Sequence, residues 1–226
     1  MPIEAARRAT DSIPIVILAC DRADRLVANI ARPGGNITGM ACISSDLALK
    51  RLQLLQEVVP KLSRLAVLYN GGVPAKVAEL QDIMAAAKIL EIEVQSADVR
   101  DASGFKTAFA TIKSGDPQAL IIFAEPVTFI HLKEIAEFAA EQRLPSMYGF
   151  REFCDAGGLL SYGTNLVVQY RHYSYFIDKI LKGTKPGDIP IEEPTTFELI
   201  VNNRVAKSLG LTLPMSIMIS ADELIE

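Results

Sequence analysis

The stretch that decides the fold is residues 64–124, which read RLAVLYNGGVPAKVAELQDIMAAAKILEIEVQSADVRDASGFKTAFATIKSGDPQALIIFA. Short apolar runs alternate there with longer runs whose apolar residues recur at helical spacing. Strands separated by helices form mainly parallel sheets. We therefore expect strands over Arg64–Tyr69, Glu91–Ser96 and Ala119–Ala124, with helices over Val73–Leu90 and Ser103–Lys113 between them.

The same alternation continues on both sides of this stretch. Ile13–Ala19 is a bare apolar run, as expected for a strand buried on both faces, and Arg32–Asn36 breaks the structure with a proline and two glycines. The remaining expected helices are Arg22–Ala31, Ser44–Val59, His131–Gln142, Arg151–Gly157, Asn165–Lys182 and Asn203–Leu209. The remaining expected strands are Ser146–Tyr148, Gly158–Tyr162 and Phe197–Val201. The fold class is α/β.

The order of these elements predicts two lobes. Residues 61–148 hold a nearly complete set of strand–helix units, which predicts one lobe, and the flanking segments belong to another. We expect a first lobe from residues 1–40 and 164–196. Residues 41–163 and 197–226 are expected to form the second lobe and the hinge crossovers.

Composition narrows the function. Half of the 226 residues are hydrophobic, which supplies a packed core, and the net charge of −4 is spread without a basic patch, so nucleic acid is not an expected partner. No apolar run reaches the ~18 residues that span a bilayer, so direct membrane insertion is not expected, and the chain begins without an export signal. The three cysteines have no metal-like spacing and are interpreted as core residues.

Several motifs resemble one family. Residues 31–39 read ARPGGNITG, and similar segments follow at Arg64–Asn70, Leu144–Gly149 and Gly157–Gly163. The tail is the most specific part: ILKG at 180–183, FEL at 197–199, LGL at 209–211 and ADELIE at 221–226 occur in the family's order and spacing. By these motifs the chain resembles the ABC transporter substrate-binding proteins, whose characterised relatives include tryptophan-binding proteins.

The resemblance implies the type I periplasmic-binding-protein fold, in which two α/β lobes are joined by three crossovers and hold a ligand in the cleft between them. It implies a periplasmic or extracytoplasmic protein that binds a small-molecule solute, such as an aromatic or branched amino acid, and delivers it to ABC permease subunits. Ile3–Ile17 resembles the end of the first lobe's third helix and its fourth strand, so the first lobe is expected to be incomplete. The alternative is a ligand-sensing regulatory domain of the same fold, as in LacI-like repressors.

Ligand contacts in this fold are expected in loops at the carboxyl ends of strands. For an amino acid, Asp21 or Glu125 would bind the ammonium group, and Thr38, Asn70 and the backbone after Tyr69 would bind the carboxylate. Asn36 belongs to the same set, Tyr148 would offer a stacking wall, and Gly39 and Gly163 are expected hinge positions.

Each of these residues also has a purely structural interpretation. Asp21 precedes an expected helix and suits an N-cap, while Asn36 and Thr38 suit a turn. Tyr69 suits a residue that only fills the interlobe wall, and Glu125 suits a solvated loop charge. Plain turns are equally compatible with the two hinge glycines.

Enzymatic motifs are absent from the sequence. His131 and His172 lie outside any metal-ligand spacing, and neither a Gly-x-Ser-x-Gly elbow nor a Walker phosphate loop is present. A carboxylate pair of Asp21 and Glu125 is the one catalytic arrangement left open. We expect a binding protein without catalysis, cofactor or metal.

Overall fold

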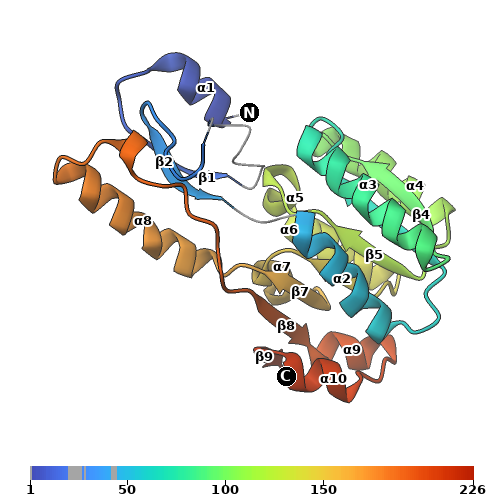
Figure 1. The fold of residues 1–226 in the computed structure, drawn as a ribbon. Helices are drawn as coiled ribbons and strands as arrows, with labels where there is room; N and C mark the ends of the chain where they lie inside the picture. Colours follow the sequence, from blue (N-terminus) through green and yellow to red (C-terminus); the bar gives the residue numbers. More distant parts are fainter. Residues whose placement is uncertain (1, 20–26, 28, 42–44) are drawn as a thin grey trace. The chain divides into compact units, whose positions relative to one another are not determined.

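The computed structural model describes residues 2–19, 27, 29–41 and 45–226 (Figure 1). The chain divides into two compact units. Unit 1 consists of residues 1–44 and 164–196, and unit 2 consists of residues 45–163 and 197–226. The chain therefore passes between the units three times, after residues 44, 163 and 196.

Unit 2 is built on a sheet that, in the described part of the chain, has seven strands in the order β4-β3-β5-β6-β7-β8-β9. Its strands are β3 (Arg64–Tyr69), β4 (Glu93–Asp98), β5 (Ala119–Ile122), β6 (Ser146–Tyr148), β7 (Leu160–Gly163), β8 (Glu198–Asn202) and β9 (Glu223–Ile225). The pairs from β4 to β7 are parallel, while β7 and β8 are antiparallel. This confirms the expected parallel α/β architecture.

Helices cover both faces of this sheet because its strands are apolar on both sides. Leu65 and Val67 of β3 join one core with residues of α2 (Ser45–Val58) and α3 (Pro74–Ile89). Ala66 and Leu68 join a second core with residues of α4 (Phe105–Ser114) and α6 (Leu132–Glu141). The result is a three-layer unit, visible in Figure 1.

Short elements complete unit 2. A 3-10 turn, η2 (Ala102–Gly104), precedes α4, and α5 (Pro126–Ile130) and α7 (Arg151–Asp155) follow β5 and β6. The last part of the chain forms α9 (Asn203–Leu209) and α10 (Met215–Ser220) before β9. The sequence did not predict α5, α10 or β9, because each element is too short to show a clear periodicity of apolar residues.

Unit 1 contains a smaller sheet. Its strands β1 (Ile15–Ala19) and β2 (Ile37–Ala41) pair in parallel. Figure 1 shows α1 (Pro2–Ala9) and α8 (Leu166–Leu181) on opposite sides of this pair. Ile17 packs in a cluster with Ile37 and Ile191, and Phe176 of α8 packs with Met40 and with Ile189, which follows η3 (Pro186–Asp188).

One expectation about unit 1 differs from the structure, and another falls mostly outside the described residues. No strand was expected directly after the break at Arg32–Asn36, but the structure has β2 there, whose glycine and threonine hid its β character. The expected helix Arg22–Ala31 falls mostly outside the described residues, as does the site residue Asp21.

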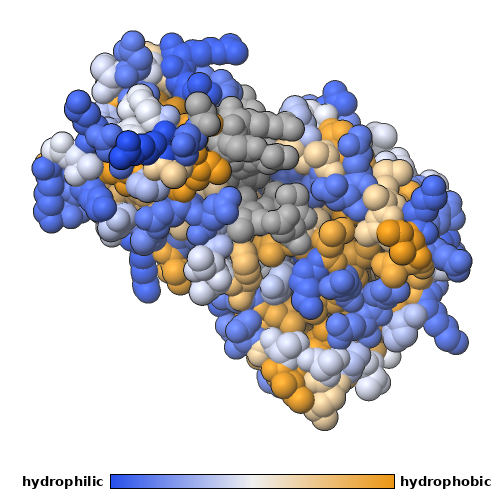
Figure 2. All heavy atoms as spheres, viewed as in Figure 1, coloured by the Kyte–Doolittle hydropathy of each residue, from blue (hydrophilic) through white to orange (hydrophobic). Residues whose placement is uncertain are grey.

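Within the described ranges, no helix is both long enough and apolar enough to span a membrane. Figure 2 shows hydrophilic and apolar residues interspersed over the visible face of unit 2. Single exposed apolar residues such as Ile89 and Ile219 are ordinary on a folded surface.

Candidate functional site

The candidate site lies at the carboxyl edge of the unit 2 sheet. Strands β4, β3 and β5 are neighbours and run parallel, so the residues that follow them gather at one edge. Loops at this edge of a parallel sheet are where ligands bind in open α/β folds. The segment after β3 begins with Asn70, and the segment after β5 leads to Glu125.

Asn70 and Glu125 are brought together by this topology. The Asn70 Nδ2 donates to Glu125 Oε2 over 3.2 Å, although the two residues lie 55 positions apart. Both are buried, with exposed fractions of 6% and 7%. A buried carboxylate needs partners, and here an amide supplies one where a cation is usual. This pair is the polar centre of the edge.

Glu125 is held in place by the start of α5. Its Oε1 accepts from the Thr128 backbone N–H at 3.1 Å, and the Thr128 hydroxyl accepts from the Glu125 N–H at 3.2 Å, which forms a capping box. Pro126 occupies the first turn, where a missing N–H costs nothing. Each carboxylate oxygen therefore makes one hydrogen bond and keeps capacity for another donor.

The backbone after Tyr69 is already engaged. The Gly71 N–H donates to Asp98 Oδ1 at 2.6 Å, and the Gly72 N–H donates to Asn70 Oδ1 at 2.9 Å. The expected use of these amides for a ligand carboxylate is therefore not supported, because the turn consumes both donors. Tyr69 itself ends β3 and is partly buried, with its ring packed against one core.

Tyr148 packs in the core instead of lining the edge. Its side chain is fully buried, and its ring stacks on Phe153 with centroids 4.6 Å apart. Burial raises the pKa of its phenol. The role of a stacking wall is not supported by this position, since β6 turns alternate residues to opposite faces and Tyr148 points under the helices.

Asn36 and Thr38 also have structural roles. Asn36 immediately precedes β2 and Thr38 is its second residue, so both lie at the amino end of the strand, whereas ligand loops in open α/β folds follow the carboxyl ends. The Asn36 amide donates to the carbonyls of Thr10 and Ile13 at 3.2 and 2.8 Å. The buried Thr38 hydroxyl donates to the Ile189 carbonyl at 2.9 Å.

The two expected hinge glycines occupy tight places. Gly39 has φ +138°, and a Cβ there would stand 2.1 Å from the Ile17 carbonyl oxygen of the paired strand. Gly163 is the last residue of β7 and of its unit 2 segment, and a Cβ there would stand 1.9 Å from the Gly149 oxygen. Close backbone approach explains both glycines.

Sequence reasoning missed a buried ionic cluster beside this edge. Arg51 of α2 and Lys76 of α3 both pair with Glu79, at 3.4 and 2.8 Å, and all three side chains are at most 4% exposed. Burial lowers the pKa of Arg51, which the nearby Glu79 partly offsets. The available signal was an arginine inside the apolar stripe of α2, between Ala48 and Leu55.

No group of three metal-ligating side chains occurs in the described part of the chain. The His131 ring lies 3.1 Å from the Glu134 carboxylate, and the His172 ring lies 2.7 Å from the Glu192 carboxylate. Cys154 is buried in the core as expected, and this burial raises the pKa of its thiol to about 12. Cys20 and Cys42 lie outside the described residues.

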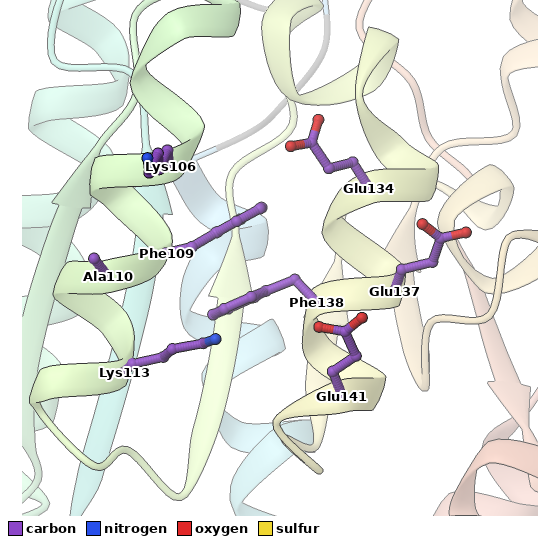
Figure 3. A pocket seen from close by; sticks show the side chains of 8 residues that line it. All are labelled: Lys106, Phe109, Ala110, Lys113, Glu134, Glu137, Phe138 and Glu141. Atoms are coloured by element: carbon purple, nitrogen blue, oxygen red, sulfur yellow. The ribbon is translucent and has the colours of Figure 1, made fainter.

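A surface groove of about 350 Å³ lies between α4 and α6, away from the Asn70–Glu125 pair. Figure 3 shows Phe109 and Phe138 pointing toward one another across it, and their rings stack with centroids 4.0 Å apart. The rest of the groove is lined mainly by charged residues: Lys106 and Lys113 on α4, and Glu134, Glu137 and Glu141 on α6. The groove is therefore an aromatic contact between α4 and α6 that is bordered by charged side chains of both signs.

Comparison with known proteins shows the family. A family model described as ABC transporter substrate binding protein matches residues 4–225. The chain is 25% identical over 215 residues to a tyrosine-binding protein of Clostridioides difficile, a match that covers 92% of this chain and 60% of the relative. The chain thus spans about three fifths of that relative's length.

Two solved structures show the fold. A conserved domain protein from Vibrio cholerae matches with a TM-score of 0.89 and 21% identity, covering 98% of this chain and 75% of the other. A Streptococcus pneumoniae ABC domain in complex with L-Trp matches with a TM-score of 0.88 and 21% identity, covering 99% and 77%. The type I periplasmic-binding-protein fold expected from sequence is confirmed by these neighbours.

Proposed function

Because the chain belongs to the ABC transporter substrate-binding protein family, we propose that it binds an amino acid for an ABC importer. The proposed amino acid is aromatic. In this role the chain acts outside the cytoplasm, delivers its solute to the permease subunits and catalyses no reaction. A tyrosine-binding relative and a neighbour that holds L-Trp support the choice of solute.

The observation that carries the proposal is the Asn70–Glu125 pair. Glu125 is a buried carboxylate whose recorded partners are neutral donors, namely the Asn70 amide and the Thr128 N–H. A ligand ammonium would supply the missing positive charge and use the remaining oxygen lone pairs. Tyr69, at the end of the neighbouring strand, is the aromatic residue closest in sequence to this pair.

Thermal unfolding with and without L-tyrosine and L-tryptophan tests this function, because a ligand of the native state raises the midpoint. We expect one of them, at about 100 times its Kd, to stabilise the chain by about 2.7 kcal/mol. N-acetyl-L-tyrosine, which lacks the ammonium group, should leave the midpoint unchanged. A chain that no amino acid stabilises would contradict the proposal.

A matched pair of variants tests the role of Glu125. Glu125→Gln keeps the shape of the side chain but removes its charge, and should abolish the shift that the amino acid produces. Glu137→Gln makes the same change on the exposed face of α6 and should leave the shift intact. Equal shifts in both variants would remove Glu125 from the site.

A further inference from the structure

The buried cluster of Arg51, Lys76 and Glu79 has no part in the proposed solute contacts, yet it occupies the interior of unit 2. We propose that Arg51 is a positioning residue: it fixes the end of β7, where the chain leaves unit 2, to helix α2, where the chain enters it. The inference rests on the proposed function only in treating these chain crossings as hinge points.

Arg51 lies close in the chain to the point where unit 2 begins. It stands six residues after Ser45, where unit 2 begins, which is about 9 Å along the helix. Its Nε donates to the carbonyl of Tyr162 at 2.8 Å, and Tyr162 is followed by Gly163, the last residue before the second crossing. Gly163 also pairs with Glu198, next to the third crossing. The Arg51 side chain thus ties α2 to the end of β7, and the pairing of Gly163 with Glu198 places the start of β8 beside that end.

The Arg51 guanidinium packs against the backbone of two glycines. Cβ atoms placed on Gly149 and Gly163 would stand 3.2 and 3.5 Å from Arg51 Nη2, so this nitrogen lies against two glycine backbones. The Gly149 position is also 2.7 Å from Ala124 Cβ. Arg51 therefore touches the segment that follows β6 and the last two residues of β7, and Gly149 in turn lies against Ala124, the residue before Glu125.

The charges of Arg51, Lys76 and Glu79 favour a positioning role over a stabilising one. Two cations share one carboxylate, so the cluster buries a net positive charge. Such clusters contribute little stability compared with apolar residues of similar size, because desolvation offsets the attraction between the charges. What an apolar residue cannot supply is a directed hydrogen bond from α2 to the Tyr162 carbonyl. The geometry therefore points to positioning as the role of the cluster.

Lys76 and Glu79 complete the arrangement. Glu79 accepts from Lys76 Nζ through Oε2 and from Arg51 Nη1 through Oε1, so it sets the plane of the guanidinium. A planar donor held on one side by a carboxylate aims its Nε in one direction. Lysine in place of Arg51 would keep the charge and lose this aim.

Hydrogen–deuterium exchange on the full chain, without solute, tests the proposal. In the triple variant Arg51→Met, Lys76→Met, Glu79→Met, the apolar replacements keep the core filled. We expect exchange in peptides covering residues 160–164 and 197–200 to become about 10-fold to 100-fold faster, the range for losing a hydrogen bond to a charged donor. Exchange in residues 65–68 of β3 should be unchanged.

Two single variants complete the experiment. Arg51→Lys should accelerate the same two peptides and no others, which keeps the test valid if the triple variant fails to fold. Arg64→Lys is the matched control, because Arg64 Nε also donates to a backbone carbonyl, that of Asp116 at 2.7 Å, on the exposed surface of the same unit. It should leave residues 160–164 unchanged.

Two results would overturn the proposal: unchanged exchange at residues 160–164 in Arg51→Lys, or equal acceleration at residues 65–68, which would mean a loss of stability throughout unit 2. Neither depends on a solute. An amino acid that fails to bind would count against the proposed function and leave the exchange result standing.

Discussion

Replacing Asn70 by alanine should destabilise unit 2 through two hydrogen bonds at once. The Asn70 Nδ2 donates to the buried Glu125 carboxylate, and its Oδ1 accepts from the Gly72 N–H. The first bond involves a charged acceptor and contributes about 1.5–3 kcal/mol, and the second contributes about 0.5–1.5 kcal/mol. The expected loss is therefore about 2–4.5 kcal/mol of unfolding free energy.

Urea unfolding followed by far-ultraviolet circular dichroism measures this loss in the unit 2 transition. Gln81→Ala, an exposed change on α3, is the control and should stay within about 0.5 kcal/mol of the unchanged chain. A loss below about 1 kcal/mol for Asn70→Ala would refute the reasoning, because it would mean that Glu125 finds other partners without cost.

Asn70→Asp sharpens the same test through pH. The new carboxyl would face Glu125, and two adjacent carboxylates cannot both ionise cheaply, so the folded-state pKa of the pair is raised above its unfolded value. A raised pKa means that stability is present at low pH and is lost as pH rises. Asn70→Asp should therefore regain more stability between pH 7 and pH 5 than Asn70→Ala, which loses the amide donor but adds no second carboxylate.

The remaining predictions concern a thiol and a glycine. Because burial raises the pKa of Cys154 to about 12, its thiolate fraction at pH 8 is lower by about three orders of magnitude than in the unfolded chain, and iodoacetamide should label its peptide only after unfolding. The same shift stabilises the fold below pH ~8.5, and this contribution is lost as pH rises further; rapid native labelling would contradict the burial. Gly39→Ala should cost about 2–5 kcal/mol in unit 1, because its Cβ would meet the Ile17 carbonyl oxygen at a strained φ. Gly34→Ala, also at positive φ but with open space around it, should cost only about 1–2 kcal/mol in urea unfolding, and equal costs would exclude the steric explanation.

The sequence by itself determined the architecture of unit 2. Its strands and helices alternate with clear periodicity, so β3 and the helix Asn203–Leu209 were located to the residue. Periodicity reports which faces are buried, and it suffices where a segment is long and apolar. It failed at β2, whose glycine and threonine resemble a loop, and at short elements such as α5.

The candidate site was only partly accessible from sequence. The rule that ligands meet the carboxyl ends of strands selected both Asn70 and Glu125, because the rule depends only on topology, but it did not predict that the two side chains bond to each other. It could not show that Gly71 and Gly72 spend their amides on the turn, or that Tyr148 points into the core. The first outcome depends on the geometry of the turn after β3, and the second on which face of β6 the Tyr148 side chain takes.

The tertiary structure alone decided the Arg51 cluster. Its three charges come from two helices, and its hydrogen bond reaches the end of a strand 111 residues away along the chain. A sequence displays the charge of each residue and the local period in which it recurs. Whether a charge is buried, and what it then holds in place, is fixed only when helices and strands pack together and exclude water from the space between them.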